Sequence, residues 1–335
     1  MRIVEPSVEI MRTGMETEFC TPEQFIEKVG RTCYKSEDKI TDDSAAKFVG
    51  NLVKRGHEAM IEHWNLVFKV EKDIYERIVN DWLALSSKCT NDNRPTRQSR
   101  MRFTQTNFGE GDVRYVVSAN MRAWRDLVKD LVAEIGFIPQ YLHGVVRNYS
   151  LFFPEFQDYV PAVIQNDKLI PIYIWELSPM ERRTHQNITV KIVCDRGVSH
   201  EIVRHRAASY AQESTRYCNY GLDKFGSEIT VVRPSWCSIG DDMYKDWFVG
   251  CCDSESAYFK MLADGATPQM ARSVLPNSLK TEIIVTASLD DWDHFFDLRC
   301  DPAAQPDMKE VADMTRMLFD GTEYICCHCM EEEDD

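Results

Sequence analysis

The densest group of residues that could do chemistry lies between residues 204 and 217, where the chain reads RHRAASYAQESTRY. The segment holds three arginines, a histidine and several hydroxyls, and Glu213 is its only acid. A solvated helical face would place carboxylates three or four residues from each arginine. Guanidinium groups bind phosphate oxygens bidentately, and a serine hydroxyl adds a donor. The segment therefore favours a phosphate site, with an exposed basic loop or one docked on acidic surface as the alternative.

Composition and charge restrict the classes of partner. The chain has 335 residues, 44% of them hydrophobic, and a formal net charge of −15. Such an acidic protein is not expected to cover nucleic acid or an anionic membrane with its whole surface. No stretch approaches the ~18 apolar residues of a membrane helix, and the N-terminus lacks an apolar signal core. We therefore expect a cytoplasmic protein whose twelve cysteines are reduced.

Capping residues and hydrophobic spacing predict the elements that must position this segment. Helices are expected to begin at Thr21-Pro22, Thr41, Ser118, Thr267-Pro268 and Gln305-Pro306. Short β-branched runs predict strands over 65–70, 189–194, 228–233 and 281–287. Their irregular order favours an α+β (mixed α/β) fold over a repeating βαβ array. No glycine-rich dinucleotide or P-loop motif is present.

Four sequence blocks together resemble one known family. Arg204-His205-Arg206, followed after seven residues by Ser214, is similar to the signature of the flavin-dependent thymidylate synthases. The blocks GHEAMIEH (56–63), ARSVLP (271–276) and WDHFFDLRCDPAAQ (292–305) also resemble that family and follow its order. The resemblance covers about residues 41–70 and 187–319. It implies one thymidylate synthase-like catalytic domain over 1–335 with a large insertion at 71–186 within it. The acidic run at the end of the sequence separately predicts a disordered tail over 326–335.

The resemblance implies an enzyme that converts dUMP to dTMP by reductive methylation. Methylenetetrahydrofolate would supply the carbon, and non-covalently bound FAD, reduced by NADPH, would carry the hydride. The resemblance also implies a homotetramer with shared active sites. Its partners would be small-molecule substrates and copies of itself, without nucleic acid, membrane or metal. A homologue that has lost methylation and acts as an NAD(P)H oxidase or sensor is the alternative, and a nucleic-acid-binding protein is a more distant one.

The family's functional residues map onto matching positions of this chain. The resemblance places dUMP at Glu201, Arg204, Gln212, Ser214, Arg216, Arg272 and Arg299. It places FAD at His57, Ala59, Arg204, His205, Arg206, Gln212, Ser288 and His294. Arg299 is the catalytic candidate, since a fixed guanidinium can stabilise negative charge on the uracil ring. Positive charge on Arg204, His205 and Arg206 would favour the anionic form of a reduced flavin.

Each of these roles has a plainer structural alternative. His57 and His294 could be ordinary structural histidines, and Arg299 could compensate a helix dipole. Ser214 is expected to bind substrate rather than act as a nucleophile, because His205 is the only candidate base. Glu201, Gln212, Ser288 and Ala59 depart from residues common in the family. No Pro-Cys dipeptide, which marks the other class of thymidylate synthase, occurs in the chain.

Two further groups of residues carry weaker signals. A basic run contains Arg94, Arg97, Arg100 and Arg102, and a solvated loop is favoured over a nucleic-acid or cofactor contact there. The sequence Cys326-Cys327-His328-Cys329 has residue types that ligate metals, but adjacent cysteines rarely bind one ion. We expect reduced thiols at this position.

Overall fold

The computed structural model describes residues 1–12, 14, 20–88, 101–109, 111–222 and 225–321. Arg94, Arg97 and Arg100, the cluster Cys326–Cys329 and the predicted acidic tail lie outside these residues. The chain forms two compact units. The first unit contains Met1–Thr13, Lys28–Lys39 and Ile188–Asp335, and the second contains Gly14–Glu27 and Ile40–Asn187. Each unit is described below by itself.

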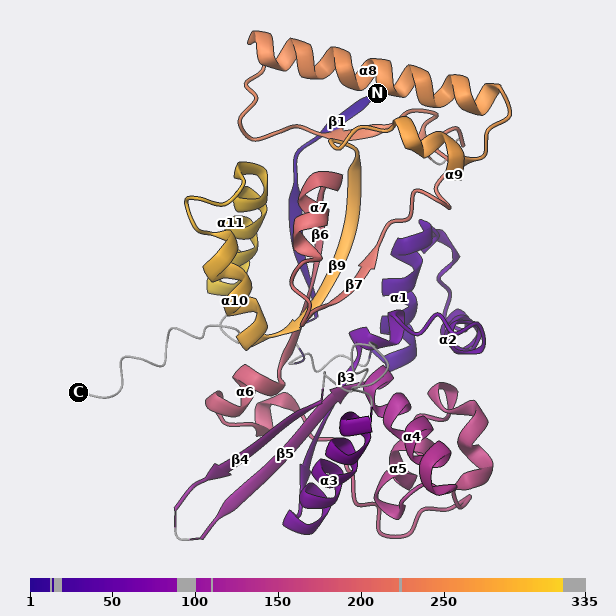
Figure 1. Cartoon of the computed structure of the whole chain (residues 1–335), viewed down its shortest axis with the longest axis vertical. Coiled ribbons are helices and arrows are strands. Elements are labelled where there is room, and N and C mark those ends of the chain that lie inside the picture. Colours follow the sequence, from indigo (N-terminus) through magenta and orange to yellow (C-terminus); the bar gives the residue numbers. More distant parts are fainter. Residues whose placement is uncertain (13, 15–19, 89–100, 110, 223–224, 322–335) are drawn as a thin grey trace, which may run out of the picture. The chain divides into compact units, whose positions relative to one another are not determined.

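The first unit is built on a four-stranded sheet in the order β2-β6-β9-β7 (Figure 1). Its strands are β2 (Ser7–Arg12), β6 (Asn187–Asp195), β7 (Ser209–Gln212) and β9 (Lys280–Ser288). β2 is antiparallel to β6, and β7 is antiparallel to β9. A separate parallel pair joins β1 (Arg2–Val4) to β8 (Thr230–Val232). β9 is buried along almost its full length, as its run of apolar and β-branched residues predicts.

The first unit also contains helices that pack against its strands. They are α7 (Arg196–Ile202), α8 (Asp242–Ala263), α9 (Pro268–Ala271), α10 (Leu289–Arg299) and α11 (Pro306–Asp320). The helices α7, α10 and α11 bury Val198, Trp292 and Val311 together with the apolar face of β6 and β9. A second core lies under α8, where Cys251 and Tyr258 pack against Val231 and Leu279.

The second unit contains an antiparallel three-stranded sheet in the order β3-β5-β4. Its strands are β3 (Asn65–Val70), β4 (Arg102–Asn107) and β5 (Val113–Asn120). The helices of this unit are α2 (Ser44–Lys54), α3 (Lys72–Lys88), α4 (Met121–Ile135), α5 (His143–Asn148) and α6 (Pro179–His185). The helix α1 (Pro22–Tyr34) begins in the second unit and ends in the first.

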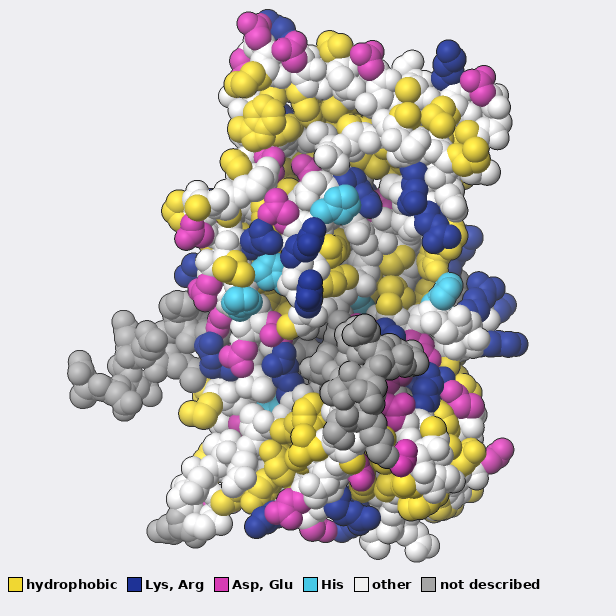
Figure 2. All heavy atoms as spheres, viewed as in Figure 1, with side chains coloured by type: hydrophobic (Ala, Val, Ile, Leu, Met, Phe, Trp, Pro, Cys, Tyr) yellow, Lys and Arg dark blue, Asp and Glu magenta, His cyan; other side chains and the backbone are white. Residues whose placement is uncertain are grey.

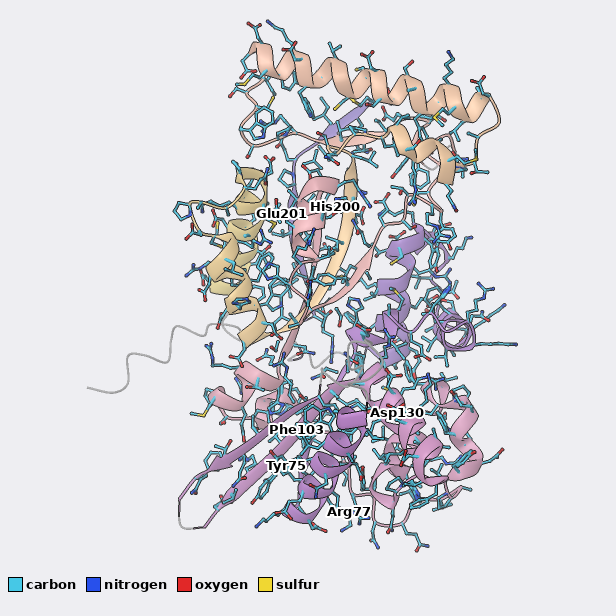
Figure 3. The ribbon with its side chains drawn as sticks, viewed as in Figure 1. Tyr75, Arg77, Phe103, Asp130, His200 and Glu201 are labelled. Carbon is cyan, nitrogen blue, oxygen red and sulfur yellow. The ribbon has the colours of Figure 1, made fainter. Side chains whose placement is uncertain are left out.

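Aromatic packing connects the helices of the second unit to its sheet. Trp124 of α4 is fully buried and meets Phe68 of β3 edge-on, with 5.2 Å between ring centroids. On α3, Tyr75 packs edge-on against Phe103 of β4 at 5.9 Å (Figure 3). These contacts bury the apolar stripe of each helix, which is the main source of stability for helices of this length.

The predicted α+β class is confirmed, and most of the predicted elements are present. The helix expected to start at Ser118 instead begins at Met121, because Ser118 belongs to β5 and Asn120 is the N-cap. That helix ends at Gly136, whose φ of 79° is left-handed. The long helix α8 was not predicted. Only Cys251 and Tyr258 are buried in it, so its sequence lacks a clear apolar stripe.

The predicted insertion supplies sheet partners to the segment before it. The strand β3 ends at Val70, and its neighbour β5 lies inside 71–186. β5 also pairs with β4 of the same stretch, so the sheet is built from both sides of the expected boundary. The division into one catalytic domain and an insertion stays a prediction. Among the described residues, no helix is both long enough and apolar enough to cross a membrane.

Candidate functional site

A pocket of about 330 Å³ lies in the first unit, between the turn after α7 and the helix α10. The ionisable basic and acidic groups that line it are Arg204, His205, Arg206, His294, Arg299 and the acid Asp291, and Tyr210 adds a hydroxyl. Its apolar wall comes from β9 and α10, with Val285, Trp292 and Phe295. Figure 2 shows basic side chains and histidines gathered on this part of the unit. The structure thus brings together two sequence blocks that lie almost ninety residues apart.

Local capping explains how the pocket residues are placed. The Oδ1 atom of Asp195 accepts a hydrogen bond of 2.6 Å from the Val198 amide and so starts α7. This helix ends at Ile202, so Arg204–Arg206 lie in the turn before β7. Ser288 caps α10 through the Asp291 amide, at 3.3 Å, and the helix ends at Arg299.

Arg299 is held by three contacts on its guanidinium group. Its Nη1 atom donates to Oε2 of Glu201 at 2.6 Å, and its Nη2 atom donates to the Glu201 carbonyl at 3.2 Å. Its Nε atom donates to Nε2 of His205 at 2.9 Å. Glu201 lies in the last turn of α7 (Figure 3). The arginine is therefore preorganised and does more than compensate the dipole of its own helix.

His205 is neutral in this arrangement, which corrects the positive charge expected for it. Burial, followed by the positive charge of Arg299 and then by His294, lowers the pKa of His205 to about 4. Its ring also packs against Phe295, with 4.9 Å between centroids. A neutral ring that accepts from Arg299 through Nε2 carries its proton on Nδ1. Positive charge at the pocket therefore comes from the arginines.

Arg204 and Arg206 are exposed at the rim of the pocket. Within the described part of the chain, neither guanidinium group makes a hydrogen bond or ion pair with a protein side chain. Cationic groups in a polypeptide of net charge −15 would ordinarily find carboxylate partners nearby. Two guanidinium groups left open beside an apolar wall fit an anionic, aromatic ligand.

Three of the residues that the resemblance assigned to dUMP, Ser214, Arg216 and Arg272, form a second cluster at the other end of β7. Ser214 and Arg216 follow directly after this strand, and Arg216 is exposed. The Arg272 Nη1 atom donates to the Thr215 hydroxyl at 3.3 Å, so the ARSVLP block meets this segment. The Ser214 hydroxyl accepts from the Arg216 amide at 3.4 Å, and no histidine of the described residues bonds to it. This agrees with binding rather than nucleophilic attack.

Two further candidates use their side chains within the protein. Gln212 donates to the hydroxyls of Ser199 and Thr281, at 2.9 and 3.2 Å. The buried Ser288 hydroxyl forms the α10 cap and donates to Asp291 at 2.6 Å. Neither residue lines the pocket of the first unit. Their assigned contacts with FAD or dUMP remain predictions.

His57 and Ala59 belong to the second unit and are both exposed. They flank Glu58, a buried carboxylate that accepts from Arg125 at 3.0 Å and from Lys129 at 2.7 Å. Burial would raise the pKa of Glu58, but these two cations lower it overall. The chain turns after α2 at Gly56, whose φ is 70°. This buried ion cluster fixes the short loop that carries His57.

Sequence reasoning missed the pocket's apolar wall. Trp292, Phe295 and Leu298 recur at helical spacing within a block that was quoted for its histidine and arginine. This spacing could have indicated the apolar wall, but it does not distinguish a pocket wall from any other buried helix face. Within the described residues, no group of three or more histidine, cysteine or acidic side chains is placed to hold a metal ion.

Comparison with known proteins identifies the family of the chain. A family model described as thymidylate synthase complementing protein matches residues 17–76 and 165–320. These segments make up more than half of the chain, so the protein belongs to this family, and the resemblance stated from its sequence is confirmed. The unmatched stretch between the two segments lies within the predicted insertion.

Several curated relatives carry the name flavin-dependent thymidylate synthase. The protein of Pyrococcus furiosus is 38% identical over 129 residues, which cover 38% of this chain and 52% of the relative. That of Geobacter sulfurreducens is 36% identical over 124 residues, covering 37% and 52%. That of Synechocystis is 30% identical over 141 residues, covering 40% and 66%. The matched region thus spans about half to two thirds of the length of these relatives.

Proposed function

We propose that the protein is a flavin-dependent thymidylate synthase. It methylates dUMP to dTMP with methylenetetrahydrofolate as carbon donor and with FAD, reduced by NADPH, as hydride carrier. The observation that carries the proposal is the preorganised Arg299 beside the open guanidinium groups of Arg204 and Arg206, within an apolar-walled pocket. Two sequence blocks of the family form this pocket.

The pocket residues suit the proposed cofactor by charge and shape. Arg204 and Arg206 would bind its anionic groups, and Trp292 and Phe295 would pack against apolar ring surface. The neutral His205 would donate from Nδ1, since its Nε2 accepts from Arg299. FAD, when bound, supplies the hydride chemistry, and the protein supplies binding and orientation. His57 and His294 remain further proposed contacts.

On the substrate side, Arg299 would face the uracil ring and stabilise negative charge on it. A guanidinium fixed in a partly dry pocket stabilises developing charge more strongly than a mobile one in water. Glu201 would hold this group in place, since it accepts from Arg299 through its carboxylate and its carbonyl. Arg216, Arg272 and Ser214 would bind the nucleotide's phosphate. A cytoplasmic location accords with such a role and stays a prediction.

The purified protein is expected to bind FAD non-covalently and to form dTMP. Denaturation should release intact FAD into the supernatant, and incubation with dUMP, methylenetetrahydrofolate and NADPH should yield dTMP by chromatography. Flavin retained on the denatured chain, or absent from the native protein, would contradict the proposed cofactor. NADPH oxidation that is independent of dUMP and gives no dTMP would favour the oxidase alternative.

We further propose a homotetramer in which two copies complete each active site. Arg299 contacts residues that precede β7, whereas Arg272 contacts Thr215, which follows it. The four-residue strand between them is roughly 13 Å long. Residues assigned to the base and to the phosphate of one nucleotide therefore lie at opposite ends of β7 in one chain. Two copies arranged head to head would bring the complementary ends together.

Mixing two inactive variants tests this arrangement. Arg299→Ala and Arg272→Ala should each lose activity, and equal mixing with subunit exchange should restore about one quarter of the wild-type rate. This fraction is expected because each shared site draws the two arginines from different copies. Sedimentation measures the tetramer separately. Absence of recovery, with exchange proven by mass-tagged subunits, would place both arginines of a site on one chain.

A further inference from the structure

Two buried carboxylates and three partly buried lysines form a charged cluster at the start of the segment 213–217 in the first unit. Its members come from β9, from β6 and from the residues that directly follow β7 and α1. They are Glu213, Glu282, Lys280, Lys35 and Lys191. None of them lines the pocket beside Arg299, and the family resemblance assigned no role to any of them.

Lys280 is the central cation of this cluster. Its Nζ atom lies 3.0 Å from Oε2 of Glu213 and 2.6 Å from Oε1 of Glu282. The Glu213 side chain is only 2% exposed. Burial would raise the pKa of Glu282, but Lys280 and then Lys35 outweigh it and lower this pKa to about 2. The Glu282 carboxylate is therefore ionised, and Lys280 is the ion-pair partner of Glu213.

Backbone contacts connect this ion pair to the phosphate cluster. The Glu213 amide donates to the Glu282 carbonyl at 2.8 Å, which extends the pairing of β7 with β9 by one residue. The next amide, that of Ser214, donates to the Cys33 carbonyl at 3.1 Å. The rings of Tyr34 and Tyr217 then pack at 5.3 Å between centroids. The conformation of residues 214–217 is thus set at both ends.

Buried ion pairs are weak sources of stability, because desolvation of the charges offsets most of their attraction. Apolar residues of similar size would fill this space as well or better. The ion pair between Lys280 of β9 and Glu213, however, has a defined geometry and fixes the point at which the chain leaves the sheet. We infer that Lys280 is a positioning residue, which acts through Glu213 to hold Ser214, Thr215 and Arg216 in the conformation that binds the nucleotide phosphate. This inference rests on the proposed function.

Replacement of Lys280 by methionine tests the inference against a matched control. Lys280→Met keeps the side-chain length and leaves Glu213 without its cation. Lys191→Met removes the same charge from the same cluster, since Lys191 lies 3.3 Å from Oε2 of Glu282, but leaves the Lys280–Glu213 pair intact. Both variants lose one positive charge near the phosphate site, so a difference between them is not a general electrostatic effect.

Calorimetric titration of the flavin-loaded full chain with dUMP gives a dissociation constant without turnover. Lys280→Met should raise it about tenfold, because binding must then order the displaced segment. Lys191→Met should stay within about twofold of wild type. In dTMP assays, Lys280→Met should raise KM for dUMP while kcat at saturation changes little, a split that general loss of structure would not produce.

A second variant keeps the test decisive if Lys280→Met does not fold. Glu213→Gln preserves the shape and a hydrogen-bond acceptor and should weaken dUMP binding by a smaller factor, about threefold. Equal dissociation constants for wild type and the folded variants would overturn the positioning role and leave the proposed function intact. Failure of the wild-type protein to bind dUMP would overturn the proposed function, and the inference with it.

Discussion

Arg299→Ala is expected to lower the rate of dTMP formation at saturating dUMP by ~10²–10³, because it removes one preorganised group that stabilises charge. The variant should still bind FAD, since Arg204 and Arg206 remain at the pocket rim. The measurement is dTMP formation against dUMP concentration. A matched control is Arg233→Ala, whose guanidinium pairs with Glu5 at 2.8 and 3.0 Å outside the pocket. A wild-type rate in Arg299→Ala would remove this arginine from the mechanism.

Arg299→Ala should also change the pKa of His205, which can be measured without enzymatic turnover. Arg299 contributes to the low pKa of His205 through its positive charge. Without it, the pKa of His205 should rise from about 4 toward its ordinary range near 6.5. Burial would still hold the pKa below that value, because burial is the largest cause of the shift. An NMR titration of the ring protons checks this, and Arg233→Ala should leave the His205 titration unchanged.

Trp292→Ala is expected to destabilise the first unit by about 3–5 kcal/mol, the usual loss for a large aromatic residue removed from a core. The Trp292 side chain is 1% exposed and packs against Phe295, Phe296 and Phe319 with centroid separations of 5.3–5.8 Å. Its Nε1 atom donates to the Ile188 carbonyl at 3.1 Å. The substitution leaves a cavity and removes the hydrogen bond to the Ile188 carbonyl on β6.

Hydrogen exchange distinguishes this loss from a general effect, because the chain contains two units whose unfolding need not be concerted. Amides of β6 and β9 should lose protection in Trp292→Ala, whereas those of β3 and β5 should keep theirs. Trp175→Ala, at a tryptophan 41% exposed, is the matched control and should change stability by no more than ~0.5 kcal/mol. Unchanged protection of β6 would show that the first unit does not depend on this packing.

Helices with a capping residue and a regular spacing of apolar residues were predicted from the sequence. The helix α11 begins after Gln305, whose side chain accepts from the Met308 amide, and the spacing of its buried residues was visible beforehand. The strand β4 has no such signal, because Phe103 is its only apolar residue and it lies on a sheet edge, where none of its residues is fully buried. The helix α8 gave none because its surroundings bury only two of its residues.

In the site, too, the local sequence blocks were predictable, whereas the long-range contacts between them were not. The blocks that contain Arg204 and Arg299 could be identified as candidate site segments from the sequence, because each combines arginine and histidine in a pattern that resembles the family. The contact between the two blocks could not be predicted, because the hydrogen bond between Arg299 and His205 joins positions 94 residues apart. The neutral state of His205 follows from that contact and from burial, so residue type alone suggested the wrong charge. The Lys280–Glu213 pair, 67 residues apart, has the same long-range origin.

The pairing of the first residues with distant strands has a consequence for synthesis on the ribosome. β2 pairs with β6 and β1 with β8, so both N-terminal strands wait for partners encoded far downstream. At about 5–20 residues per second, β2 waits roughly 10–35 s for β6 to be made. Within that interval the whole 40–187 segment emerges, with the strands and core of the second unit. The second unit can therefore fold first, while β2 stays exposed to chaperones until β6 is made, and β1 until β8 is made.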